Sequence, residues 1–251
     1  MRAGLAAAVL AMALCRAALA AGPAADQHGA VARVIDGATF ALADGRTVRL
    51  AALDLPPPER HRALAEAARG TLAALVERRE VGLATSGAGT DRYGRLVAHV
   101  VAPQGRWVQA EMVAKGLARV AIAAEDDAPL GLLLAREAEA RQARRGLWAL
   151  PQYRVLRADE AARFLDTMQL VEGEVRGVAR NGGRVFLNFG ADWRSDFTVL
   201  VPAAARRRFA GRDLDLEALQ GQMVRVRGWI EWYNGPLIEI ARPEQIEVIE
   251  R

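Results

Sequence analysis

Short strands joined by glycine-containing turns are the feature that most constrains the fold of this chain. Apolar and polar residues alternate along 47–53, and the Asp44-Gly45 turn joins this stretch to a second strand pattern at 39–42. An Asp-Gly pair between two such stretches is a strong hairpin signal. With a further strand at 31–35, the chain is therefore predicted to begin its fold as three strands joined by tight turns.

A helix rich in Ala and Leu and two more strands follow. The helix is expected at 63–77 and the strands at 80–84 and 96–101, and the Gly, Ser and Thr residues of 85–90 indicate a loop between these strands. Helices at 108–115 and 130–145 complete this part of the chain. Strand, strand, strand, helix, strand, strand is the order of a five-stranded Greek-key barrel with helices, the OB-type fold.

The same order of elements is expected again in the second half. The strands are predicted at 170–178, 185–189, 197–202, 223–232 and 237–240, with a short helix around 203–219 and a hairpin turn at Asn234-Gly235. With 251 residues, of which 52% are hydrophobic, the chain can bury two small cores. We therefore expect a mainly β fold with helices (α+β). Its parts are an OB-type barrel at 29–150, a connector at 151–166 and a second, OB-like barrel at 167–250.

The first twenty residues have the pattern of a signal peptide. Arg2 supplies a basic start, Leu5 to Leu14 form an apolar segment, and Ala18-Leu19-Ala20 is a small-x-small cleavage site. The pattern predicts a signal peptide at 1–20 and export to the periplasm or the extracellular space, with no membrane association after cleavage. The single cysteine, Cys15, would leave with this segment, which excludes disulfides and cysteine metal sites from the mature chain.

The charge of the chain gives no indication of a nucleic-acid-binding surface. The formal net charge is +4, and removal of Arg2 and Arg16 leaves +2. Such a small excess predicts no general affinity for nucleic acid. Binding would have to rest on local groups.

Five spaced motifs give this chain a family resemblance. They are Asp36-Gly37-Ala38-Thr39, the stretch Arg49 to Pro56, Asp91-Arg92-Tyr93-Gly94-Arg95, Gly116-Leu117-Ala118-Arg119-Val120 and Arg145-Gly146-Leu147-Trp148. In type, order and spacing they resemble the staphylococcal (thermonuclease-type) nuclease family over roughly residues 31 to 150. The resemblance implies a phosphodiester hydrolase with the OB-type fold.

The resemblance also implies which residues form the site. Arg49 and Arg95 match the arginines that hold the scissile phosphate, with Tyr93 and Asp91 beside them as substrate-binding candidates, and Asp54 matches a calcium carboxylate. Two positions depart from the pattern. Ala38 stands where the family has its other calcium carboxylate, and Pro57 stands where it has the glutamate that activates water.

These departures weaken the expected chemistry. Calcium takes six to eight oxygen ligands, several of them anionic, so we expect any calcium binding to be weak. A general base contributes about 10²- to 10⁴-fold to a rate, and Glu59 is the candidate for a relocated base. An extended run at Pro56-Pro57-Pro58 would displace its carboxylate by roughly 6 Å. The other interpretations are that Glu59 is a helix N-terminal acid, that Arg95 fixes its own turn and that Arg49 pairs with an internal acid.

Aromatic residues are the binding candidates of the second barrel, because OB domains bind oligonucleotides or oligosaccharides through aromatic side chains. Alternation along the strands indicates that several of them, notably Phe186 or Trp229, are part of the core. Trp232 and Tyr233, next to a turn, are expected to be partly exposed and to contact a ligand. The run Arg206-Arg207-Arg208 is consistent with a phosphate contact or with a solvated helix face.

Three functions follow from these patterns, in order of preference. The first is an exported, weak or inactive nuclease that acts as a module binding single-stranded nucleic acid or another protein. The second is an active calcium-dependent phosphodiesterase that hydrolyses DNA or RNA with Glu59 as the relocated base. The third is a tandem barrel that binds carbohydrate or protein.

Overall fold

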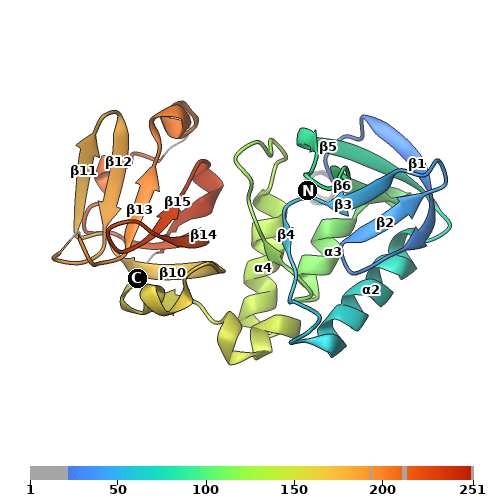
Figure 1. The fold of residues 1–251 in the computed structure, drawn as a ribbon, viewed down its shortest axis with the longest axis horizontal. Coiled ribbons are helices and arrows are strands. Elements are labelled where there is room, and N and C mark those ends of the chain that lie inside the picture. Colours follow the sequence, from blue (N-terminus) through green and yellow to red (C-terminus); the bar gives the residue numbers. More distant parts are fainter. Residues whose placement is uncertain (1–21, 193, 211–213, 250–251) are drawn as a thin grey trace, which may run out of the picture. The chain divides into compact units, whose positions relative to one another are not determined.

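The computed structural model describes residues 22–192, 194–210 and 214–249. The predicted signal peptide at 1–20 lies outside the described residues. The chain divides into two compact units (Figure 1). Unit 1 extends to Val120 and includes Glu125–Ala149, and unit 2 comprises Ala121–Ala124 and the chain from Leu150 onward.

Unit 1 contains a closed five-stranded barrel. Its strands are β1 (Gln27–Val34), β2 (Thr39–Leu42), β3 (Thr47–Leu50), β5 (Glu80–Thr90) and β6 (Leu96–Ala102). β1 pairs antiparallel with β2 and β5, β2 with β3, and β5 with β6. A parallel pairing of β3 with β6 closes the cylinder. This is the predicted OB-type arrangement.

Helices and short strands complete unit 1. The helices are α2 (Arg62–Val76), α3 (Val108–Ala114) and α4 (Gly131–Gln142), and the short strands are β4 (Leu53–Asp54), β7 (Arg106–Trp107) and β8 (Arg119–Val120). Single 3-10 turns occur at Pro103–Gly105 and Gly146–Ala149. α3 packs against both α2 and α4 (Figure 1). Helix α2 buries Ala68, Leu72, Leu75 and Val76, the spacing of one apolar helix face.

The end of α3 lies in close backbone contact with the chain that follows α4, and a glycine stands on each side of this contact. A Cβ atom on Gly116 would lie 2.1 Å from the Arg145 carbonyl oxygen, and one on Gly146 would lie 2.2 Å from the Gly116 carbonyl oxygen. The Leu147 N–H donates to that same Gly116 oxygen at 2.8 Å. Both glycines belong to the motifs of the resemblance, and this close backbone approach is the reason that no side chain fits there.

Unit 2 contains a second closed sheet. Its strands are β9 (Leu156–Arg157), β10 (Met168–Glu174), β11 (Gly177–Asn181), β12 (Arg184–Asn188), β13 (Thr198–Val201), β14 (Met223–Trp232), β15 (Pro236–Glu239) and β16 (Ile246–Val248). The pairing order is β11-β12-β13-β15-β14-β10, and β13 and β15 are parallel. Because β10 and β11 are consecutive parts of one interrupted strand, the path closes on itself in the OB order.

Short helices connect the strands of unit 2. They are α5 (Arg206–Ala210) and the 3-10 segments Pro151–Tyr153, Ala158–Phe164, Ala203–Ala205, Glu217–Leu219 and Pro243–Gln245. The expected helix at 203–219 is therefore divided into short pieces, and residues 211–213 lie outside the described part. Residues of the expected connector also belong to the sheet, because β9 pairs in parallel with β10.

The expected loop at 85–90 is wrong. β5 continues to Thr90, which pairs with Leu96 of β6, and the register shifts between Thr85 and Thr90. Gly87 and Gly89 have φ angles of +56° and +80°, so they form an irregularity within the strand. A glycine-rich composition is typical of loops, but here it accommodates a bulge that only glycine adopts at low cost.

The assignment of Phe186 or Trp229 to the core is also wrong. Trp229 is 56% exposed, and Phe186 is half-buried and lines a surface pocket. The neighbours Val185 and Leu187 on β12 point inward and are buried, so alternation places Phe186 on the outer face. Phe189 and Phe197 fill the core instead, with ring centroids 5.0 Å apart.

Among the described residues, none of the helices combines the length and the apolar composition that a membrane crossing requires.

Candidate active site

A tight turn at Asp36–Thr39 joins β1 to β2 and forms one edge of the site. The Ala38 N–H donates to Asp36 Oδ1 at 2.7 Å, and the Ile35 N–H donates to the Thr39 carbonyl at 2.9 Å. A Cβ on Gly37 would lie 2.7 Å from Ala68 Cβ, so the turn requires glycine where α2 approaches it. Ala38 presents a methyl group at the position of the family's calcium carboxylate.

Arg49 is exposed on β3, beside this turn. The Leu50 N–H donates to the Ala38 carbonyl at 2.8 Å, which fixes β3 against the turn. Within the described residues, the side chain of Arg49 has no hydrogen-bond or ion-pair partner. The predicted alternative, pairing of Arg49 with an internal acid, is therefore not seen in this part of the chain, and the guanidinium has its donors available for an anion.

Strand register places Arg95 at the start of the strand next to Arg49. β3 and β6 pair in parallel with Arg49 opposite Val97, two residues after Arg95. Residues two apart on a strand point to the same side, and neighbouring strands lie about 4.8 Å apart. The two arginines that the resemblance assigns to phosphate therefore come from β3 and from the residue directly before the neighbouring strand β6.

Arg95 is held in place by Asp91. Its Nε and Nη2 atoms lie 2.8 and 2.7 Å from Asp91 Oδ2, and the Tyr93 and Arg95 N–H groups donate to Asp91 Oδ1 at 2.9 and 3.0 Å. Desolvation alone would raise the pKa of Asp91, but the hydrogen bonds from the Arg95 side chain and from the two backbone groups outweigh it and lower this pKa. Asp91 therefore stabilises the turn and fixes the orientation of the Arg95 side chain.

Tyr93 is an exposed ring between two cations. It is 67% exposed, and the guanidinium carbons of Arg92 and Arg95 lie 4.8 and 5.1 Å from its centroid. Cation–π contacts of this kind hold a ring in place at the surface. The arrangement offers a stacking surface next to two positive charges, a combination that suits single-stranded nucleic acid.

Asp54 is occupied by a partner that the sequence did not indicate. Strands β4 and β8 place Asp54 opposite Arg119, and Arg119 Nε and Nη2 donate to Asp54 Oδ2 at 3.0 and 2.7 Å. The Arg119 side chain is 6% exposed and that of Asp54 is 25% exposed. The carboxylate is thus neutralised by a buried cation.

Glu59 lies in a turn that replaces the expected extended run. The Arg60 and His61 N–H groups both donate to the Pro57 carbonyl, at 3.1 and 3.0 Å, so the chain reverses before α2 begins at Arg62. The extended geometry predicted for the prolines is therefore wrong beyond Pro57. Glu59 is exposed, and its side chain makes no hydrogen bond within the described residues.

The two altered positions line one pocket of about 440 Å³. Ala38 comes from the turn and Pro57 from the proline run, and α2 closes the other side with Leu64 and Ala68. Ala38 and Pro57 contribute only apolar groups to this lining, and Asp36, Arg62, Glu66 and Arg69 are its charged members. Glu59 is not among the residues that line this pocket.

These residues do not fit a calcium ion. One oxygen of Asp54 accepts a hydrogen bond from Arg119, and one oxygen of Asp36 accepts a hydrogen bond from the Ala38 N–H. In the part of the chain that the structure describes, no group of three or more His, Cys, Asp or Glu side chains is placed to hold a metal. Calcium requires several anionic oxygens, which this site does not present.

Trp232 and Tyr233 lie in unit 2, at the end of β14, and each is 62% exposed. Tyr233 lines a pocket together with Phe186, whereas Trp232 does not. The ligand candidates predicted from the sequence therefore occur in both units. The sequence missed Arg119, since two-residue strands give no periodic signal, although the residue lies within one of the five motifs.

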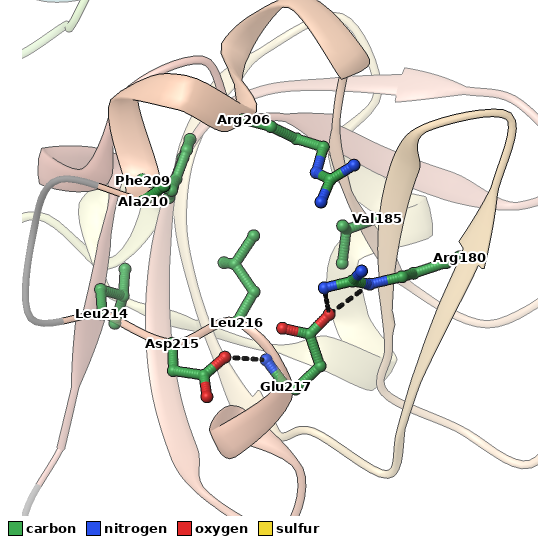
Figure 2. Close-up of a pocket in the computed structure, with 9 residues that line it drawn as sticks. All are labelled: Arg180, Val185, Arg206, Phe209, Ala210, Leu214, Asp215, Leu216 and Glu217. Atoms are coloured by element: carbon green, nitrogen blue, oxygen red, sulfur yellow. Dashed lines mark hydrogen bonds and ion pairs between the residues drawn. The ribbon is translucent and has the colours of Figure 1, made fainter.

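Another hollow in unit 2 has a volume of about 510 Å³. Figure 2 shows Arg206 of α5 pointing into it, and Arg180 of β11 directed at Glu217, with which it forms an ion pair. Asp215 is the fourth charged side chain among its described lining residues. Two acids and two bases balance there, so this hollow has no net charge that would select phosphate.

Comparison with known proteins places unit 1 in a family. Residues 47–150 match the family described as staphylococcal nuclease homologue. Two similar proteins, from Escherichia coli O157:H7 and from Escherichia coli, are each named "Uncharacterized endonuclease". Each is 36% identical to this chain over 126 residues, which is 50% of this chain and 79% of the relative. The chain therefore belongs to the staphylococcal nuclease homologue family.

Proposed function

We propose that this protein is an exported nuclease homologue with a degenerate active site. In this proposal it binds single-stranded nucleic acid through its first barrel and hydrolyses it weakly or not at all. Export is proposed on the leader pattern at 1–20. The observation that carries the proposal is the pair Asp54–Arg119, since it occupies the one remaining family carboxylate.

Binding rests on groups that the degeneracy leaves intact. Arg49 has its donors available, Arg95 is oriented by Asp91, and Tyr93 offers an exposed ring beside them. Bidentate contacts from arginine suit phosphate oxygens. Stacking on an aromatic ring is tolerant of sequence because every base has a π-face. The proposed ligand is therefore a flexible single strand without a fixed sequence.

Hydrolysis lacks two of its requirements. Pro57 has neither a carboxylate nor an N–H, and the absence of a general base lowers a rate by about 10²- to 10⁴-fold. The metal site is short of anionic oxygens, as described above. We expect cleavage of denatured DNA to be at least about 10²-fold slower than by a family member with both carboxylates.

A second candidate function is active, metal-dependent hydrolysis with Glu59 as the base. It is favoured by the names of the two relatives and by the exposed position of Glu59. The purified full chain, incubated with denatured DNA in calcium, magnesium, manganese or chelator, distinguishes the two. Robust cleavage that Glu59→Gln abolishes, with circular dichroism unchanged, would establish the second candidate. Retention of the strand without cleavage supports the first.

A further inference from the structure

A small pocket of about 270 Å³ lies on the outer face of the second barrel. Phe186 and Tyr233 contribute two aromatic rings to its lining, and Asn181, Asn188 and Asn234 contribute three amides. Its volume is below the roughly 300–1,000 Å³ of pockets that enclose whole drug-sized ligands. It suits a single planar group that belongs to a longer ligand.

The strand register explains why these side chains face the same space. Ala179 of β11 lies opposite Phe186 of β12, and Asn188 lies opposite Thr198 of β13, which in turn lies opposite Leu237 of β15. Side chains paired in this way share one face of a sheet. The small Ala179 side chain leaves room beside the Phe186 ring. The β14–β15 turn brings Tyr233 to the same opening.

The amides keep hydrogen-bonding capacity for a ligand. Asn188 Oδ1 accepts a bond from Thr198 Oγ1 at 3.4 Å, which leaves the Asn188 NH₂ group without a partner among the described residues. The side chains of Asn181 and Asn234 likewise make no hydrogen bond within that part of the chain. Amide groups both donate and accept, so they match the mixed donor and acceptor edge of a base.

The charges around the pocket point to one kind of ligand. None of its described lining residues is charged, so the group inside should be neutral. Arg184 lies two residues before Phe186 on β12, about 7 Å along the strand. It is exposed, and its side chain has no hydrogen-bond or ion-pair partner within the described residues. A neutral pocket with a cation beside it suits a base and the phosphate attached to it.

We propose that this pocket holds one unpaired nucleobase of a single strand, against Phe186 and Tyr233, with the flanking phosphate at Arg184. The inference rests on the proposed nucleic-acid binding and assigns the second barrel a part in it.

The test compares two labelled strands by fluorescence anisotropy with the full chain in chelator at low salt. One strand is an oligothymidylate and the other is an abasic strand of the same length and charge. We expect the oligothymidylate to bind at least about 5-fold more tightly, and Tyr233→Ala to weaken its binding by about 5- to 150-fold. Asn188→Ala should weaken it as well. Trp229→Ala is the matched control, because Trp229 is an exposed aromatic residue of the same barrel outside the pocket.

Equal binding of the two strands would overturn the inference, as would equal effects of Tyr233→Ala and Trp229→Ala. Competition by a neutral oligosaccharide that is lost in Tyr233→Ala would also overturn it, since the pocket would then take a sugar. Failure of the proposed function has a different result. If neither strand binds, both proposals fail. If both strands bind equally and Arg49→Ala removes this binding, the binding by unit 1 stands and the base pocket alone is refuted.

Discussion

Arg119 donates from both Nε and Nη2 to a single oxygen of Asp54, at 3.0 and 2.7 Å. The arginine side chain is buried, and the carboxylate is three-quarters buried beside it. The carboxylate that the resemblance assigns to calcium is therefore the counter-ion of a buried cation in this chain. This role is structural, and it competes with metal binding for the same oxygen.

Asp54→Asn tests the structural role. Asp54→Asn replaces the charged acceptor of two Arg119 donors with a neutral amide, and hydrogen bonds to charged groups contribute about 1.5–3 kcal/mol. We expect the free energy of unfolding in urea to fall by about 1–3 kcal/mol. The control is Glu66→Gln, which removes an ion pair whose side chains are 88% and 66% exposed. Glu66→Gln should lower the free energy of unfolding by less than about 0.5 kcal/mol. Equal effects of the two variants would refute the role.

Ala38→Asp tests the metal site. The unmodified protein should bind calcium no more tightly than millimolar, because its site lacks anionic oxygens. Adding a carboxylate at the β1–β2 turn should strengthen the binding measured by calorimetry, whereas Ala43→Asp, at the exposed turn after β2, should not. Micromolar binding of calcium by the unmodified protein would show that another set of ligands exists.

Acid should remove the contribution of Asp91 to stability. Its pKa in the folded protein lies below the ordinary 3.8, so its stabilisation is complete above 3.8 and is lost as the pH falls through the lower folded value. We expect Asp91→Asn to lower the free energy of unfolding near neutral pH and to have a shrinking effect in acid. The exposed Glu231→Gln serves as a surface control. A difference that stays constant into strong acid would contradict this expectation.

The barrels were predictable because strand alternation and tight turns determine them. Asp44-Gly45 and Asn234-Gly235 mark hairpins that the structure contains, and β2 and β14 have the predicted bounds. The segment 85–90 was not predictable in this way, since Gly87 and Gly89 give the same composition in a loop and in a bulged strand. β5 extends to Thr90 because this residue pairs with β6 across the barrel, which the composition of the segment does not reveal.

The candidate site was predictable only in part. Local motifs identified Arg49 and Arg95, and the parallel pairing of β3 with β6 makes neighbours of the strand that carries Arg49 and the strand that Arg95 precedes. The Asp54–Arg119 pair joins residues 65 positions apart through strands of two residues, which no local pattern reveals. Phe186 was assigned to the wrong face because alternation gives two faces but does not say which of them is buried.

Arg49→Ala should weaken binding of single strands and reduce its dependence on salt. Each phosphate contact on a single strand contributes about −0.7 to the slope of log K against log salt. We expect the slope to become less steep by about that amount. Arg33→Ala, which removes an exposed arginine of β1, should leave the slope unchanged. An unaltered slope in Arg49→Ala would exclude Arg49 from phosphate binding.

Binding and cleavage of one labelled single strand by the full chain in calcium distinguish a binding module from an active nuclease. We expect the strand to shift to the bound position in a native gel and to be recovered intact, with a cleavage rate at least about 10²-fold below that of an intact family member. Rapid, calcium-dependent cleavage of the bound strand would contradict the proposed function, and its loss in Glu59→Gln would identify the base.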